Sequence, residues 1–466
     1  MSIEIPIEPL PNLSYTLCMM NDGLKITDQD IQECITHLQN LIRINTTNPP
    51  GNELEACKYI AKILKKEKID YHILEPVPER GNLIARLSGD GSEQPLLLTS
   101  HLDVVPAETK KWMTDPFSGE EKDGFIWGRG AVDMKHMSAM ELCVFLKAHR
   151  EKIPLKRDLI LAAVADEETG CDYGSKWLVN HHSDLIRAEY ALNEVGAFSL
   201  PIDKKVFYPI GVAEKGSCWL RIIATGKTGH TSLPQDEQAL ANLGLAAHKL
   251  ANTSLPFHSS KPARKFIDCL AKHQPFPKNL ILKGIQKRFC SNFVLNKIFP
   301  DKERARNFHS MFHNLATPTV FHSGSKINVI ASKAEMLVDG RVLPGQSTDE
   351  FIQEVKALIG PGFQIEILKA QEPIITNYKN EFYKLLENTL IKHDPGAIPV
   401  PFLIPGYTDA KHYSRLGIKC YGFTPMKLPP DISFGSLFHG HDERIPVASI
   451  DFGLRVLWDV IVGSST

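Results

Sequence analysis

Three short apolar runs that each end in polar or acidic residues constrain the fold of this chain more than any other feature. The runs and the residues after them are 95–100 before His101 and Asp103, 159–165 before Asp166, Glu167 and Glu168, and 190–193 before Glu194. Runs of this kind indicate buried strands, and helical patterns at 134–149 and 173–187 separate them. We therefore predict an α/β domain with a mixed, largely parallel sheet, whose ligands bind beyond the carboxyl ends of the strands.

A different order of elements begins near Gly211. The predicted elements are a strand at 217–225, a helix at 239–251, strands at 319–330 and 333–343, a helix at 348–359 and a strand at 363–368. This order is that of a ferredoxin-like α+β domain. Since 466 residues are too many for one ordinary core, we predict a larger domain of residues 1–211 and 373–466. Residues 212–372 are predicted to form a domain inserted into it, for which the family resemblance given below implies the role of a lid and dimerisation domain on a zinc-binding catalytic domain.

Residues from about 256 to 316 fit this layout poorly because they are extra to it. Their mixture of basic and apolar side chains is compatible with a helix on a membrane surface. The preferred interpretation is a set of local helices packed over the inserted domain. The chain has no apolar run of about 18 residues, so no membrane span is expected.

Charge and cysteine usage narrow the class of protein. Lys and Arg total 53 and Asp and Glu 54, and this balance does not suggest a nucleic-acid or membrane partner. The first 23 residues lack the basic start and apolar run of a secretory signal. Nine scattered cysteines without a CxxC pair are typical of reduced thiols, so we expect a cytoplasmic protein.

The residues at the strand ends are of the types that bind a divalent metal. His101 is followed by Asp103, which is suited to hold the second ring nitrogen of a metal-ligating histidine, although a surface His beside an Asp is common. Asp133 follows a glycine-rich turn and suits a bridging role between two ions, with helix capping as the competing interpretation. Glu194 and His439 would complete two sets of three ligands with Glu168.

The adjacent acids Asp166, Glu167 and Glu168 are the strongest local signal. Neighbouring carboxylates near a buried site repel each other unless a cation lies among them. One glutamate can then bind the metal while its neighbour takes a proton from the attacking water. A solvated acidic turn is the alternative.

Three further residues lie in the inserted domain. His230 stands in a glycine-rich loop, 226–234, and suits stabilisation of an oxyanion, although an ordinary loop histidine is equally compatible with the spacing. Asn328 and Arg341 fall on predicted strands, and Arg341 is of the type that binds a carboxylate with two hydrogen bonds. A surface salt bridge is the alternative for Arg341.

Taken in order, these stretches resemble the aminoacylase and carboxypeptidase family of dinuclear zinc hydrolases, which includes acetylornithine deacetylase and succinyl-diaminopimelate desuccinylase. The matching stretches are 48–51, 100–106, 128–135, 166–170, 229–234 and 438–443. The resemblance covers nearly the whole chain. It departs from the family at His136, where a glycine is usual, and His441 lies close enough to His439 to be an alternative ligand.

The resemblance implies a role for each residue of the site. The implied metal ligands for two Zn²⁺ ions, with Co²⁺ or Mn²⁺ as alternatives, are His101, Asp133, Glu168, Glu194 and His439. Glu167 is the implied general base and Asp103 the partner of His101, while His230 reaches into the active site of the partner subunit in dimeric members. The implied substrate-binding residues are Asn328, Arg341, Gly406 and Thr408.

We therefore predict a metal-dependent hydrolase that cleaves the amide bond of an N-acyl amino acid or short peptide. Within this class, a deacylase and a carboxypeptidase or dipeptidase are not separated by the sequence. Two other classes of protein would require different residues. An inactive binding module should lack a ligand or the base, and none is missing; a cysteine hydrolase built on Cys171 lacks an obvious paired histidine.

Overall fold

The computed structural model describes residues 25–233, 235–299, 302–432 and 434–465. The N-terminal stretch considered as a secretory signal and Pro234 of the His230 loop lie outside the described residues. The chain divides into two compact units. The first comprises the described parts of Met1–Gln94, Ser100–Ala163 and Pro425–Thr466, and the second comprises Pro95–Thr99 and the described parts of Val164–Thr424.

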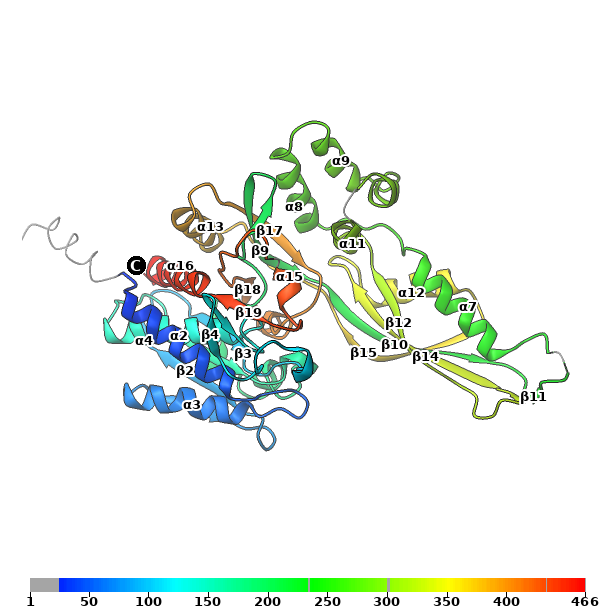
Figure 1. The fold of residues 1–466 in the computed structure, drawn as a ribbon, viewed down its shortest axis with the longest axis horizontal. Coiled ribbons are helices and arrows are strands. Elements are labelled where there is room, and N and C mark those ends of the chain that lie inside the picture. Colours follow the sequence, from blue (N-terminus) through cyan, green and yellow to red (C-terminus); the bar gives the residue numbers. More distant parts are fainter. Residues whose placement is uncertain (1–24, 234, 300–301, 433, 466) are drawn as a thin grey trace, which may run out of the picture. The chain divides into compact units, whose positions relative to one another are not determined.

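Long helices make up much of the first unit (Figure 1). Its long helices are α2 (Asp28–Arg43), α3 (Glu53–Lys66), α4 (Lys135–Arg150) and α16 (Val447–Ser465). Helix α2 begins at a capping box formed by Thr27 and Asp30, and its predicted apolar stripe is confirmed by the burial of Cys34, Leu38 and Leu41. Helix α4 is buried along almost its whole length, because α2 and α16 both pack on it.

The main sheet has ten strands in the order β1-β2-β6-β3-β7-β18-β9-β16, with β8 and β17 paired to β9. Their bounds are β1 Tyr71–Leu74, β2 Asn82–Leu87, β3 Leu96–His101, β6 Leu159–Val164, β7 Tyr190–Asn193, β8 Leu200–Ile202, β9 Lys205–Glu214, β16 Ile374–Ile375, β17 Ile398–Ile404 and β18 Lys419–Gly422. Strands β3, β7 and β18 run parallel, and β17 runs parallel to β9. The other strands that pair with β9, and the pairs β1–β2 and β2–β6, are antiparallel. The predicted α/β class with a mixed, largely parallel sheet is confirmed.

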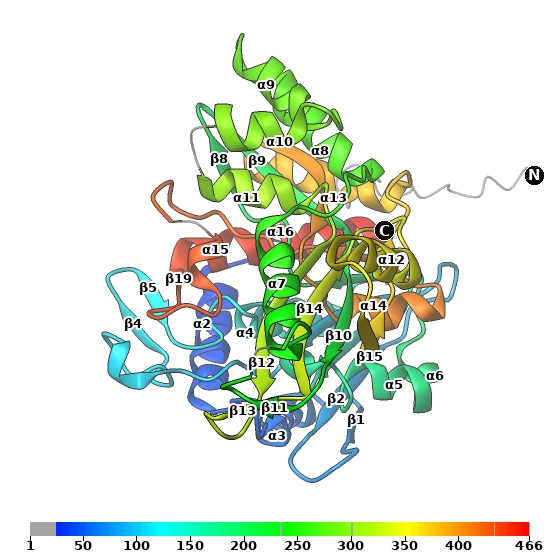
Figure 2. The ribbon, with the colours of Figure 1, turned by 90° about the vertical axis from the view of Figure 1, so that its right-hand side faces the viewer.

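The second unit contains a separate four-stranded antiparallel sheet in the order β12-β14-β10-β15. Its elements are β10 (Gly216–Thr225), α7 (Ala239–Asn252), β12 (Leu315–Ser323), β14 (Lys333–Val342), α12 (Thr348–Ile359) and β15 (Phe363–Gln371). Leu243 of α7 and Phe351 of α12 share a core with Leu220 and Met336 of the sheet, so both helices cover one face. This is the predicted ferredoxin-like order, and Figures 1 and 2 show the helices lying along the strands.

The extra segment forms the helices α8 (Lys261–Lys272), α9 (Lys278–Ile285), α10 (Ser291–Phe293) and α11 (Lys302–Ser310), with a π-helical turn at Val294–Ile298. The prediction of local helices is right, but their neighbour was predicted wrongly. Helix α8 packs on β17, and the core formed by Phe266, Ile267 and Phe312 includes Phe207 of β9. The segment therefore packs on the edge of the main sheet, because its apolar stripe matches the buried face of β9 and β17 there.

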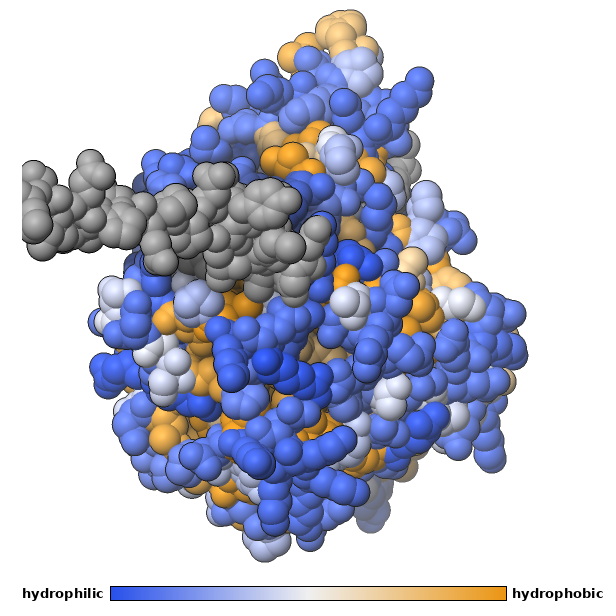
Figure 3. Space-filling view, turned by 90° about the vertical axis from the view of Figure 1, so that its left-hand side faces the viewer, coloured by the Kyte–Doolittle hydropathy of each residue, from blue (hydrophilic) through white to orange (hydrophobic). Residues whose placement is uncertain are grey.

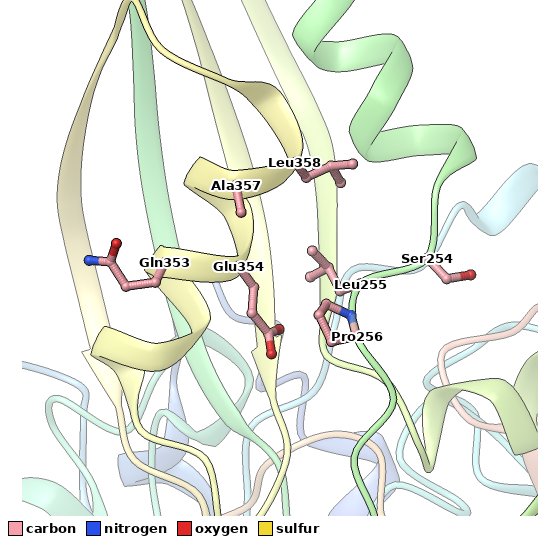
Figure 4. Close-up of a pocket in the computed structure, with 7 residues that line it drawn as sticks. All are labelled: Ser254, Leu255, Pro256, Gln353, Glu354, Ala357 and Leu358. Carbon is pink, nitrogen blue, oxygen red and sulfur yellow. The ribbon is translucent and has the colours of Figure 1, made fainter. Parts of the chain in front are cut away.

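An open groove lies beside α12 and is drawn in Figure 4. It is lined by the apolar side chains of Leu255, Pro256, Ala357 and Leu358, with Glu354 at one side. It contains none of the residues predicted for the site. Among the described helices, none has both the length and the apolar character needed to cross a membrane.

Candidate metal centre and active site

His101 is the last residue of β3 and is fully buried. Its Nδ1 lies 2.9 Å from the backbone oxygen of Asp103, and its Nε2 lies 3.1 Å from Oδ1 of Asp133. A carbonyl oxygen only accepts, so Nδ1 donates to it, and Nε2 is the ring nitrogen that faces Asp133. The end of the strand and the following turn thus present one imidazole nitrogen as a ligand atom.

Asp133 lies between two imidazoles. Its Oδ1 faces Nε2 of His101, and its Oδ2 lies 3.1 Å from Nε2 of His439. Burial would raise the pKa of Asp133, but hydrogen bonds and charge interactions with both histidines lower it well below its usual range. A carboxylate that offers one oxygen to each of two imidazole partners has the arrangement expected of a bridging ligand. The competing prediction, a helix cap, does not apply, because the residue before α4 is Met134.

Glu443 supports Asp133 from the other end of the sequence. It is fully buried, and its carboxylate accepts hydrogen bonds from the backbone N–H of Val132 at 2.7 Å and of Asp133 at 3.0 Å. Arg129 donates to its second oxygen at 2.7 Å. Burial raises the pKa of Glu443, and the Arg129 charge opposes that rise. Sequence reasoning assigned no role to this residue, although it stands in the matching stretch 438–443.

Asp103 is held in turn by Asn48, whose Nδ2 donates to Oδ2 at 2.8 Å. The other carboxylate oxygen lies 3.5 Å from Nδ1 of His101, longer than the 2.9 Å contact that the Asp103 backbone oxygen makes. Asp103 therefore orients His101 mainly through its main chain, while its buried charge lies next to the ring. Asn48 was also without a predicted role, and its place in the stretch 48–51 is the signal that could have found it.

The acidic loop follows β6 as a short 3₁₀ turn, Glu167–Thr169. Asp166 adopts a left-handed conformation (φ 69°), which aspartate tolerates better than most residues. Its carboxylate accepts from Thr169 Oγ1 at 2.5 Å and from the backbone N–H of Tyr173 at 3.1 Å. The Asp166 carboxylate therefore stabilises the turn. Of its neighbours, Glu167 is buried and Glu168 is half-buried.

The structure brings the five predicted ligands together in two groups that share Asp133. The ligand-type atoms of His101, Asp133 and Glu194 lie within 4.8 Å of one another, and so do those of Asp133, Glu168 and His439. Two imidazoles and three carboxylates offer nitrogen and oxygen donors of the kind that Zn²⁺, Co²⁺ and Mn²⁺ accept. Three carboxylates that converge in one partly buried place repel one another and would be costly without cations among them. The donor set therefore fits a pair of divalent metals.

His439, rather than His441, faces Asp133. It lies in a left-handed conformation (φ 58°) just after the short helix α15 (Phe434–Leu437). His441 is exposed. His136, the departure from the family, is fully buried in α4, and neither of its ring nitrogens has a hydrogen-bond partner within the described chain. Burial lowers the pKa of His136 to about 3, so the ring is a neutral core group.

The loop around Thr408 is tied to the strand that carries Glu194. Asn193 donates to Thr408 Oγ1 at 2.7 Å, and Thr408 donates its hydroxyl to Glu214 at 2.5 Å and its backbone N–H to the same carboxylate at 3.0 Å. All three residues are buried. Burial raises the pKa of Glu214 to about 7, against the lowering effect of the Thr408 hydrogen bonds. Thr408 is a structural link here; Gly406 before it is half-buried.

Of the three residues predicted in the inserted domain, Arg341 lies beside Tyr407, whereas Asn328 and His230 are exposed. Arg341 lies on β14 with its guanidinium 5.3 Å from the ring centre of Tyr407, and Nε donates to Asp339 at 2.9 Å. Asn328 was predicted on a strand, but it lies in an exposed turn between β12 and β13 (Val329–Ile330), because the chain reverses there. His230 is exposed on β11 (Gly229–His230), and its Nδ1 lies 2.8 Å from Ser232 Oγ.

The structure does not support a cysteine hydrolase built on Cys171. Cys171 is fully buried, and burial raises its pKa well above the usual value, so that it holds its proton at neutral pH. Its sulfur lies 4.0 Å from the backbone oxygen of Glu167, as expected of a small packed loop residue.

Known proteins place this chain among the metallohydrolases. It is 31% identical over 410 residues, 84% of this chain and 78% of the relative, to the N-fatty-acyl-amino acid synthase/hydrolase of Bos taurus. The metallo-carboxypeptidase Sso-CP2 of Sulfolobus solfataricus has the same fold, with a TM-score of 0.70, 15% identity and coverage of 92% of this chain and 98% of the other. A dinuclear metal-binding peptidase of Bacillus subtilis matches with a TM-score of 0.57, 14% identity and coverage of 94% and 98%.

A protein-family model matches most of the chain. Residues 97–462 match the model described as Peptidase family M20/M25/M40, and this range contains all five grouped ligands and Glu167. The predicted resemblance is confirmed, and with it the class of enzyme, a metal-dependent hydrolase acting on acylated amino acids or peptides. The chain belongs to Peptidase family M20/M25/M40.

Proposed function

We propose that this chain is a dinuclear zinc hydrolase that removes the acyl group from an N-acyl amino acid. His101, Asp133 and Glu194 would hold one ion, and Asp133, Glu168 and His439 the other. The observation that carries the proposal is the position of Asp133, with one oxygen 3.1 Å from each of two imidazoles. When bound, the two ions would activate a water molecule and polarise the scissile carbonyl.

Glu167 is the proposed general base. It would accept a proton from the attacking water and pass it to the nitrogen of the leaving amine, so that one carboxylate serves both steps. Two observations support this role. Glu167 is buried beside the grouped ligand Glu168, and Asp166 is already occupied by Thr169 and Tyr173. Tyr407, whose pKa is raised first by burial and then by the Glu167 charge, lies close to this carboxylate.

Arg341 is the proposed partner of the substrate carboxylate. Its guanidinium lies over Tyr407, which belongs to the loop that also contains Gly406 and Thr408. Its Nε donates to Asp339 at 2.9 Å, and the terminal N–H groups of a guanidinium are suited to binding a carboxylate with two hydrogen bonds. Asn328 belongs to the proposal with weaker support, since it lies in an exposed turn.

We further propose that residues 212–372 act as a lid and dimerisation domain. In a homodimer, the exposed His230 would stabilise the oxyanion in the active site of the partner subunit. A cytoplasmic location is also part of the proposal. It is supported by the cysteines, because all eight that the structure describes are free.

The deacylase is preferred to a carboxypeptidase on one observation. The Bos taurus relative at 31% identity is named for N-fatty-acyl amino acids, whereas the likeness to the Sulfolobus carboxypeptidase is one of fold alone. A panel of N-acyl amino acids with short and long acyl chains, set against dipeptides, separates the two. Faster turnover of every dipeptide than of every acyl amino acid would reverse the preference. A chelated sample is the blank.

Glu167→Gln tests the chemistry. We expect turnover to fall by a factor of roughly 10² to 10⁴, with metal content unchanged at about two ions per chain by elemental analysis. Glu381→Gln, at a glutamate that is 87% exposed, is the matched control and should keep full activity. Substantial turnover in Glu167→Gln would remove this residue from the mechanism.

A further inference from the structure

The segment 256–316 concentrates positive charge in a nearly neutral protein. It contains twelve Lys and Arg residues and three Asp and Glu residues, so it carries a formal charge of +9 in a chain whose net charge is −1. The rest of the chain is correspondingly acidic. The overall balance from which no membrane partner was expected therefore hides two regions of opposite sign.

The same segment exposes large apolar side chains. Phe276 is 78% exposed, Phe289 94% and Phe293 61%, and Leu280 and Ile298 are also largely exposed. The segment is not short of a core, because Phe266, Leu282, Ile285 and Phe312 are buried within it. The exposed residues are thus additional to those that fold the helices. Orange side chains gather at the upper end of Figure 3, where α9 lies in Figure 2.

Exposed basic and apolar side chains lie close together in the sequence around α9. Leu280 and Lys283 lie within the helix, and Lys287 follows in the turn after it; all three are exposed, while Leu282 and Ile285 are buried in the core. Phe276 precedes the helix and is also exposed. Phe289 and Arg288 follow directly after Lys287 and are exposed as well. We call this set, together with Phe293, the α9 face.

We propose that the α9 face docks on an anionic lipid surface, with Phe276, Leu280, Phe289 and Phe293 entering the interface and Lys283, Lys287 and Arg288 facing the lipid headgroups. Amphipathic elements bind membranes through buried apolar area and through attraction between basic residues and acidic lipids. Both contributions are present in the same few turns. The inference stands apart from the proposed hydrolysis, because no residue of the α9 face belongs to the site.

A lipid surface explains the side chains better than a nucleic acid does. Bases stack on aromatic rings, but an exposed Leu280 and Ile298 offer nothing to a base or a phosphate. Lys278 forms an ion pair with Asp203 at 3.0 Å, so the proposed headgroup contacts are made by Lys283, Lys287 and Arg288 instead. A second copy of this chain is a poorer fit, because the positively charged segment would have to face itself.

Sedimentation of the full chain with vesicles tests the proposal. Vesicles of phosphatidylcholine containing about 30% phosphatidylglycerol are compared with pure phosphatidylcholine, at about 0.05 M and about 0.5 M salt. We expect binding to the anionic vesicles, at least tenfold weaker at high salt. The double variants Phe276→Ser/Phe289→Ser and Lys283→Glu/Lys287→Glu should each lower the partition coefficient, by about fivefold or more for each residue changed.

Matched controls separate a specific face from general stickiness. Ile327→Ser changes an apolar side chain that is 98% exposed in the inserted domain, and Lys65→Glu/Lys66→Glu changes exposed charges at the end of α3. Neither should alter vesicle binding. Circular dichroism and turnover of a soluble short-chain substrate verify that every variant is folded.

Three results would overturn the proposal. The first is equal binding to both kinds of vesicle, or none to either. The second is an equal loss of binding in the control variants. The third is binding of a labelled single-stranded oligonucleotide, or a concentration-dependent dimer in light scattering, that depends on Phe276 and Phe289 while the vesicles are ignored.

Discussion

Changing Glu443 to Gln removes one charge from the carboxylate that supports Asp133 and keeps its shape. Three donors share that carboxylate: the guanidinium of Arg129 and the backbone N–H groups of Val132 and Asp133. Arg129 is only 3% exposed, so water cannot replace the lost partner. The variant leaves a buried positive charge without its counter-charge and places an amide N–H₂ group opposite one set of donors.

The expected cost follows from that geometry. Removing one partner of a buried ion pair destabilises a protein by roughly 3–5 kcal/mol, against a total stability of about 5–15 kcal/mol for a typical domain. Because Glu443 also orients the backbone of Asp133, we expect metal affinity to fall by about 10- to 100-fold. The matched control is Glu55→Gln, whose exposed pair with Lys58 at 2.7 Å should contribute less than about 1 kcal/mol.

Urea unfolding followed by circular dichroism on the metal-free chain measures the first effect, and competition with a chromogenic chelator the second. A second variant isolates the cause. Arg129→Met added to Glu443→Gln should recover part of the loss, since it removes the unpaired charge. Equal unfolding midpoints for Glu443→Gln and Glu55→Gln would refute the reasoning, and so would a further loss on adding Arg129→Met.

Three further predictions concern the pH dependence of stability, the extra segment and the metal. Glu214 has a pKa of about 7 in the native state, against 4.5 for the free side chain, so between these values the native state holds a proton that the unfolded state has lost, and wild-type stability should fall as pH rises from about 4.5 to above 7. Glu214→Gln should lack this fall, so its free energy of unfolding in urea should gain on the order of 3 kcal/mol relative to wild type between pH 4.5 and pH 8. The same pH dependence in both proteins would contradict this prediction. Phe312→Ala, at a fully buried residue of the α8–α11 core, should lower the free energy of unfolding by about 3–5 kcal/mol. Phe289→Ala, at a residue that is 94% exposed, should change the free energy of unfolding by less than about 0.5 kcal/mol. Similar unfolding midpoints for the two variants would mean that the segment is not packed as described. Dialysis against a chelator should abolish hydrolysis and added Zn²⁺ should restore it, and an undiminished rate in protein shown to be metal-free by elemental analysis would rule out metal-dependent turnover.

Much of the fold follows from local patterns in the chain. Neighbouring residues are enough to define the 3.6-residue period of α2, the apolar run of β3 and the alternation of strands and helices, because each pattern lies within one short stretch of backbone. The candidate ligands could be predicted for the same reason. His101 ends β3, and Glu168 and Glu194 follow the ends of β6 and β7; in an open α/β sheet, ligands bind outside the carboxyl ends of the strands.

Local pattern is also where the predictions failed. Asn328 was read as part of a strand, but the chain turns there, and an apolar stretch that contains a short reversal has nearly the same pattern as a continuous strand. The helices of the extra segment were expected on the inserted domain. Their apolar stripes indicated burial but not the partner, and α8 packs on β17 instead.

By itself, the sequence determined the α/β class, the inserted antiparallel domain and the types of residue at the strand ends. Only the tertiary structure decided how those residues are held. Glu443 supports Asp133 across 310 positions of the chain, Asn48 holds Asp103 across 55, and Thr408 joins Asn193 to Glu214. The motif already favoured His439 over His441, and the structure adds that the His439 ring faces Asp133. The physical reason is that periodicity arises between neighbours along the backbone, whereas a hydrogen bond between distant residues exists only after the chain has folded and brought donor and acceptor within about 3 Å.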